Sequence, residues 1–198
     1  MSRRLFTLLA LLVAGLLFVP AALALRVHVR VEGKTQTIFG AAEPSLTVKA
    51  NALDALESAS IAGEFYYHVT VGGFGPYVDQ IGRYQAEGTS GWVFKVNGSS
   101  PPVGAAAVVL KPGDRVLWYW ATFGPTGGPS TLVLRKAARN CYRVLAQDDT
   151  GKTRIARGVL LRVDGRSVHA RTGSACVGAH RGLVRATLNG AVRSNALP

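Results

Sequence analysis

Apolar and polar side chains alternate along residues 25–32, which read Leu-Arg-Val-His-Val-Arg-Val-Glu. A period of two predicts a β-strand with one face packed and the other face, which carries His28, in water. Gly33-Lys34 follows as a turn signal, and residues 35–39 are predicted to be the hairpin partner of this strand.

Helical spacing replaces the alternation after Asn51. Asn51 can cap a helix and Asp54 stands three residues on, which is typical of a helix start. Leu53 and Leu56 form an apolar stripe together with nearby alanines. Gly63 is the predicted end of the helix.

Strand-like segments dominate the next sixty residues. The predicted strands are residues 65–71, 92–96, 107–110 and 115–121. Asn97-Gly98 and residues 112–114 supply turns between them. Residues 72–90 are rich in glycine and are predicted to be a long loop. One helix on a mostly antiparallel sheet makes residues 25–123 a small α+β domain.

Three ordered segments of this domain carry a family resemblance: Gly91–Gly98, with a Gly-Trp strand and a Val-Asn-Gly turn; Val103-Gly104-Ala105; and Leu110–Tyr119, with a Gly-Asp turn before an aromatic strand. Over residues 25–123 the chain resembles the transcobalamin-like C-terminal domain family, found in bacteria as a secreted domain of unknown function. The resemblance implies this α+β fold and an exported location. It also implies a corrinoid as a candidate ligand, although the helical domain that holds the corrinoid in vertebrate carriers is missing here.

A second unit begins after residues 124–130, which read Gly-Pro-Thr-Gly-Gly-Pro-Ser and are predicted to be a linker. The predicted strands beyond it are residues 142–147, 158–163, 167–171 and 183–188. Evenly spaced short strands without a helix signal predict that residues 131–198 form a small all-β sandwich of immunoglobulin-like type.

The amino terminus has the pattern of a secretory signal peptide over residues 1–24. Arg3-Arg4 precedes an apolar run from Leu8 to Val19, and Ala22-Leu23-Ala24 fits a cleavage site. No later run approaches the roughly 20 apolar residues of a spanning helix, so no transmembrane segment is expected after cleavage. The protein is expected to be exported, secreted or associated with the cell envelope, by the general secretory or the twin-arginine route.

Charge divides the chain at the predicted linker. Residues 25–130 hold eight basic and eight acidic residues, whereas residues 131–198 hold 13 basic residues, 11 of them arginine, and three acids. Arginine suits phosphate and carboxylate, so anionic envelope polymers are candidate partners. The alternative is a solvated basic surface. Nucleic acid is not expected as a partner, because export removes the target and no recognition motif is present.

Cys141 and Cys176 are an even pair in a chain with an export signal. A disulfide between them is predicted, and the bridge is expected to join the two sheets of the sandwich. The alternative, two free thiols acting on a metal or a substrate, lacks partner residues at ligand spacing.

Motifs of catalysis are missing from the sequence: there is no nucleophile elbow, no zinc-protease motif and no phosphate loop. We therefore expect that the protein is not an enzyme and needs no cofactor. No metal ligands are predicted. Aromatic residues favour a binding role, since 12 of the 14 in residues 25–198 lie between Phe65 and Phe123. The predicted ligand-binding residues, for a corrinoid or another flat or sugar-like ligand, are Trp92, Tyr119, Trp120, Phe74 and Tyr77.

The competing interpretation of these aromatics is an ordinary sheet core. The sequence thus predicts an exported, non-enzymatic binding module for a small molecule or glycan. The alternative is an adhesive or structural envelope protein held by its basic C-terminal domain.

Overall fold

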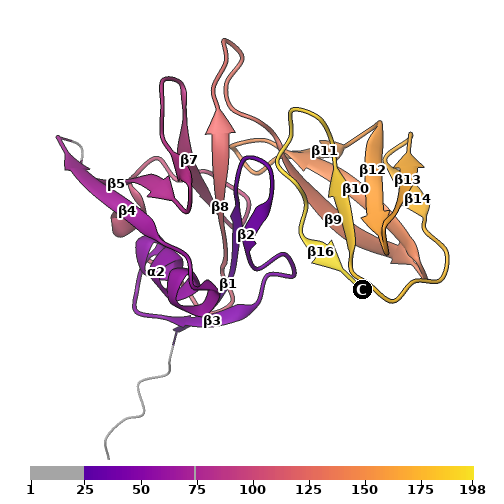
Figure 1. The fold of residues 1–198 in the computed structure, drawn as a ribbon, viewed down its shortest axis with the longest axis horizontal. Helices are drawn as coiled ribbons and strands as arrows, with labels where there is room; N and C mark the ends of the chain where they lie inside the picture. Colours follow the sequence, from indigo (N-terminus) through magenta and orange to yellow (C-terminus); the bar gives the residue numbers. More distant parts are fainter. Residues whose placement is uncertain (1–24, 74) are drawn as a thin grey trace, which may run out of the picture.

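The computed structural model describes residues 25–73 and 75–198 (Figure 1). The predicted signal peptide, residues 1–24, lies outside the described residues. The regular structure of these residues is mostly β, with one α-helix and several sheets among them. Within the described part, no helix is long and apolar enough to cross a membrane.

Residues 25–123, here called the N-terminal half, are built on a five-stranded sheet in the order β2-β1-β8-β7, with β3 paired to β1. Its strands are β1 (Leu25–Glu32), β2 (Thr37–Phe39), β3 (Ser45–Val48), β7 (Ser90–Val96) and β8 (Arg115–Thr122). The β1–β2 hairpin confirms the prediction from the alternating pattern. The β1–β8 pair is parallel, and the other pairs of this sheet are antiparallel.

Helix α2 (Ala52–Gly63) begins and ends where the sequence predicted. The side chain of Asn51 accepts hydrogen bonds from the backbone N–H groups of Leu53 and Asp54, and the carboxylate of Asp54 accepts from the N–H of Asn51. This reciprocal capping box satisfies donors that the first turn leaves free. Leu56 and the buried alanines of α2 pack against the valines of β1.

Two predictions for this half were wrong. Residues 72–90 are not a loop: β4 (Tyr67–Gly72), β5 (Gly75–Ile81) and β6 (Tyr84–Gln85) form a three-stranded sheet. Residues 107–110 are not a strand, because the 3₁₀ turn η1 (Ala105–Ala107) is followed by a single bridge from Val109 to Asn51. The first sheet forms from hairpins between strands that follow one another in the sequence, whereas residues 107–110 are placed by their contact with the distant start of α2.

Residues 131–198, here called the C-terminal half, contain two four-stranded sheets and no helix. One sheet holds β9 (Thr131–Ala138), β10 (Cys141–Gln147), β11 (Thr153–Ile155) and β14 (Ser174–Cys176). The other holds β12 (Val159–Val163), β13 (Arg166–Ala170), β15 (Val184–Thr187) and β16 (Ala196–Leu197). Their inner faces share an apolar core around Tyr142, Val144 and Leu161.

The predicted disulfide between Cys141 and Cys176 is formed. Its predicted position was wrong, because the two cysteines face each other on β10 and β14, which are adjacent strands of one sheet. The bridge therefore closes a chain segment within a sheet, whereas the bridge of antibody domains joins two sheets.

The polar face of β1 was predicted to lie in water, but its last two residues, Arg30 and Glu32, are buried, whereas Arg26 is exposed and His28 is half-buried. Glu32 is fully buried, and its carboxylate accepts hydrogen bonds from Arg30, Arg185 and Arg193. Arg185 and Arg193 come from the C-terminal half. A carboxylate taken out of water needs such charged, hydrogen-bonding partners, so this cluster joins the two halves.

Lys95 is a second buried charge between the halves. Its ammonium group donates to the carbonyl oxygen of Asp148 at 2.8 Å and lies 3.3 Å from a carboxylate oxygen of Asp149. Burial lowers the pKa of Lys95, and the nearby carboxylate of Asp149 opposes that shift. Backbone bonds add to the contact, since the N–H of Ser100 donates to Asp149 and that of Ala196 donates to Ala41.

Substitution of Glu32 tests the importance of the buried carboxylate. We expect Glu32→Gln to lower the free energy of unfolding by about 3–5 kcal/mol, because it leaves buried guanidinium groups without their anion. Urea denaturation measures the change. The control Glu87→Gln alters an exposed carboxylate and should stay within about 0.5 kcal/mol of the parent protein. A loss for Glu32→Gln as small as that of the control would contradict the assignment.

Reduction tests the disulfide. The bridged cysteines are 35 residues apart, and the chain-entropy model gives such a loop roughly 3–4 kcal/mol of stabilisation. We expect reduction to unfold residues 131–198 at a lower denaturant concentration, as followed by proteolysis. Residues 25–123 contain all three tryptophans and no cysteine, so the fluorescence change that reports unfolding of their core should occur at a higher denaturant concentration. Proteolysis that is insensitive to reductant would refute the expectation.

Candidate functional site

Strand register decides which predicted aromatic residues are core. Trp92 lies opposite Trp120 and Phe94 opposite Trp118, all on the face of the sheet that packs against α2. Trp92 and Trp118 are 8% and 2% exposed. Their indole N–H groups donate to the carbonyl oxygens of Tyr84 and Ala52. Both rings are therefore part of the hydrophobic core, and neither has a ring face that a ligand could contact.

Tyr119 lies on the other face of β8, between the two halves, and is 2% exposed. Together with Ala121 it packs against Val192 of the C-terminal half. Its hydroxyl group is 3.5 Å from a carboxylate oxygen of Asp149. Burial raises the pKa of Tyr119, and the negative charge of Asp149 raises it further. Tyr119 is thus an interface residue without an accessible ring.

Trp120 is the predicted ligand-binding residue that the structure places at a hollow. It is half-buried, and its ring lies 6.0 Å from that of Tyr84 and 5.7 Å from that of Trp92. The hollow measures about 410 Å³ and is here called the Trp120 cleft. Its lining residues are Gly33, Lys34, Trp120, Thr122, Pro129 and Asn189–Arg193. Both halves of the chain therefore contribute to the cleft.

The rim of the Trp120 cleft is fixed by the buried-charge cluster. Arg193 donates from Nε to Glu32 at 3.0 Å and from a terminal nitrogen to the carbonyl oxygen of Gly33. A side chain at Gly33 would not fit, since a Cβ atom there would lie 2.7 Å from the ring of Tyr84. The cleft thus combines a Trp, a hydroxyl group at Thr122, an amide at Asn189 and cations at its edge. A small organic ligand needs such a mixture of apolar surface and a few placed polar groups.

One donor of Trp120 lacks a partner. The indole Nε1 of Trp120 is buried and makes no hydrogen bond within the described part of the chain. Buried polar atoms are nearly always paired, so such an atom marks a place where a water molecule or ligand is expected.

The remaining predicted residues do not join the cleft. Tyr77 is on β5, 54% exposed, and is not among the lining residues. Phe74 lies outside the described residues. The sequence missed Lys34, Thr122, Asn189 and Arg193. Asn189-Gly190 has the pattern of a turn, and nothing local indicates that this turn meets Trp120 across the interface.

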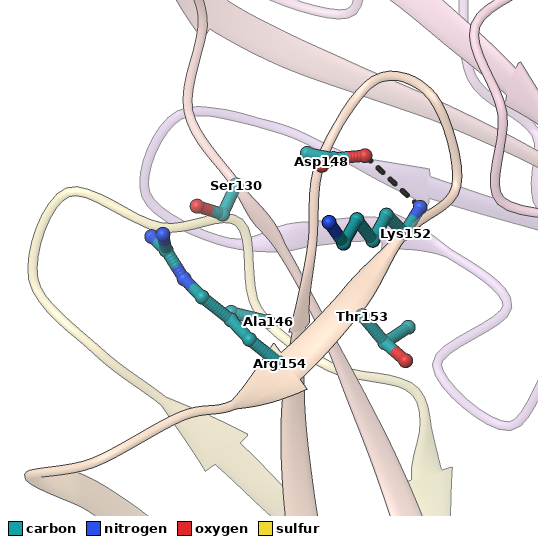
Figure 2. A pocket seen from close by; sticks show the side chains of 6 residues that line it. All are labelled: Ser130, Ala146, Asp148, Lys152, Thr153 and Arg154. Atoms are coloured by element: carbon teal, nitrogen blue, oxygen red, sulfur yellow. Dashed lines mark hydrogen bonds between the residues drawn. The ribbon is translucent and has the colours of Figure 1, made fainter.

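A second hollow of about 270 Å³ lies beside the chain segment that joins the halves (Figure 2). Ser130, Ala146, Asp148, Lys152, Thr153 and Arg154 line it. The carboxylate of Asp148 accepts hydrogen bonds from Thr150 and from the backbone N–H of Lys152, and the bond from Thr150 is the main cause of the lowered pKa of Asp148. The carboxylate of Asp148 therefore stabilises the turn over residues 148–152 through these hydrogen bonds.

Among residues 25–73 and 75–198, no group of three or more His, Cys, Asp or Glu side chains could hold a metal ion.

Comparisons with known proteins give one family match. Residues 50–122, from the cap of α2 to the end of β8, match the family described as Domain of unknown function (DUF4430). This segment lies inside the region of the transcobalamin-like resemblance, and the comparisons show no link to that family. A search of the curated proteins gave no match.

Among solved structures, the chain is similar to one described as "a putative metal binding protein from Ruminococcus gnavus ATCC 29149". The two are 17% identical, with a TM-score of 0.38, and the match covers 48% of this chain and 95% of the other.

The buried phenol of Tyr119 predicts a pH dependence. Its pKa is raised above the ordinary value of 10.0, so the folded state favours the neutral form. The resulting stability is complete below pH 10 and is lost as pH rises through the folded pKa. Burial also raises the pKa of Tyr67 to about 12, so this residue acts in the same direction. We expect Tyr119→Phe to flatten the fall in unfolding free energy above pH 10.

Urea melts at several pH values measure this fall. The matched control is Tyr77→Phe, which alters an exposed phenol and should leave the pH profile unchanged. Identical profiles for Tyr119→Phe and Tyr77→Phe would show that Tyr119 does not carry the effect.

Proposed function

We propose that the protein is an exported, non-enzymatic binding module that holds a small flat or sugar-like ligand in the Trp120 cleft. The observation that carries the proposal is the cleft itself. Trp120 is half-buried there, whereas Trp92 and Trp118 are buried, and polar groups from the other half of the chain lie beside it. Its volume of about 410 Å³ falls in the range of small-molecule sites.

The composition of the cleft favours a sugar-like ligand. An indole ring offers an apolar surface for the C–H face of a sugar, and amide and hydroxyl groups suit its hydroxyls. Thr122 and Asn189 supply such groups, and Lys34 adds a donor at the rim. A corrinoid is the second candidate, and it rests on the resemblance of residues 25–123 to the transcobalamin-like C-terminal domain family.

Export is supported by the signal pattern of residues 1–24 and by the disulfide, which is consistent with an oxidising compartment. The immunoglobulin-like classification of residues 131–198 belongs to this proposal as well. Two four-stranded sheets around one core favour it, and a bridge within one sheet does not.

The alternative of an envelope protein held by its basic half has weaker support. Arg185 and Arg193 are engaged by the buried Glu32, so they are not free to hold an external polymer. The cleft therefore provides the more specific function.

Calorimetric titration with soluble wall-glycan fragments, and separately with a corrinoid, tests the proposal. We expect binding of the glycan and a loss of affinity of about tenfold or more in Trp120→Ala, since truncation of a Trp anchor typically costs about 2 kcal/mol or more. The matched control is Tyr77→Ala, which removes an exposed aromatic side chain outside the cleft and should bind as the parent does.

Asn189→Ala provides an independent test, because Asn189 makes no contribution to the sheet core and the variant should fold. It should also weaken binding. Full affinity in both cleft variants, or loss of affinity in Tyr77→Ala alone, would place the ligand elsewhere.

A further inference from the structure

A cationic cavity lies between the two halves, apart from the Trp120 cleft. It has a volume of about 220 Å³. One wall belongs to the N-terminal half and includes Arg30, Glu43, Lys95 and Arg115, and the other wall includes Arg135 and Gln147. Four cationic side chains therefore line it against one carboxylate.

The available negative charge does not balance these cations. Glu43 is shared, since one of its oxygens lies 3.3 Å from Nε of Arg30 and the other 2.9 Å from Arg115. Lys95 is satisfied by Asp149, Thr131 and backbone carbonyl oxygens. The guanidinium group of Arg135 makes no hydrogen bond or ion pair within the part of the chain that the structure describes.

Strand register adds a second unbalanced charge beside the cavity. Arg135 on β9 lies directly opposite Arg143 on β10, and both are exposed. Like charges in directly opposed positions destabilise a strand pair. An anion bound beside Arg135 would reduce the repulsion between these two arginines.

Arg30 supplies an independent observation that points to a ligand. Its side chain is 4% exposed, and its Nε is buried without a hydrogen bond, because the nearby Glu43 oxygen lies at ion-pair distance but outside donor geometry. A terminal nitrogen of the same guanidinium group donates to Glu32 and to the carbonyl oxygen of Arg193, so the charge is paired and only Nε lacks an acceptor. A buried donor without an acceptor is costly.

We propose that this cavity is a binding site for a phosphate group, held between Arg115 on one wall and Arg135 on the other. Guanidinium groups bind phosphate oxygens through paired N–H donors. A phosphate group offers more acceptor oxygens and more negative charge than a carboxylate, so it can accept from both walls and offset more of the cationic charge. The site is separate from the Trp120 cleft, and it does not rest on the proposed function.

The experiment titrates residues 25–198 with inorganic phosphate and with glycerol phosphate by calorimetry at low ionic strength, with acetate as the comparison anion. We expect phosphate to bind more tightly than acetate. Arg135→Gln and Arg115→Gln should each weaken phosphate binding about tenfold or more, because a hydrogen bond to a charged group contributes that much. Arg171→Gln, which removes an exposed arginine just after the far edge strand β13, should bind as the parent does.

Vesicles that contain phosphatidylglycerol identify the source of the phosphate. Retention on vesicles that is lost in Arg135→Gln and kept in Arg171→Gln supports the site with a lipid headgroup as its ligand. Binding of the free phosphates without retention supports it with a soluble ligand. Equal weakening in all three variants, tighter binding of acetate, or no phosphate binding by the parent protein would overturn the proposal.

Discussion

Burial of one carboxylate, that of Glu32, organises the whole molecule. Glu32 ends β1 at the point where the N-terminal sheet meets the C-terminal half, and it has no exposed surface. A charge in that position needs cations, and two of its three come from the distant residues Arg185 and Arg193. Neither half supplies all the cations that pair with this buried carboxylate. The ion pairs of Glu32 therefore hold the two halves in their relative position.

Local chemistry made part of the fold predictable. The helix was found from Asn51 and Asp54 because a capping box is written in four consecutive residues, and the β1–β2 hairpin from a period of two. The disulfide followed from the number of cysteines. Its place within one sheet did not, since strand pairing is set by contacts between distant segments.

The polar face of β1 shows why the site could be predicted only in part. Arg-x-Glu at residues 30–32 has the pattern of a solvated strand face, and nothing local distinguishes it from one. Likewise Trp92 and Trp120 share a face of the sheet and differ in exposure. The segments that pack around each Trp set its exposure, and the residue type does not. Sequence patterns predict which residues can bury or bind, but a site between halves depends on their docking.

The same carboxylate connects the two hollows between the halves. Arg193 lines the Trp120 cleft and Arg30 lines the cationic cavity, and both donate to Glu32. A change at Glu32 would therefore disturb both hollows at once and could not assign a ligand to either. Trp120 lines only the Trp120 cleft and Arg135 lines only the cationic cavity. A substitution at either residue changes one hollow and keeps the arginines that pair with Glu32. The chemistry of each hollow can therefore be separated from the docking that creates both.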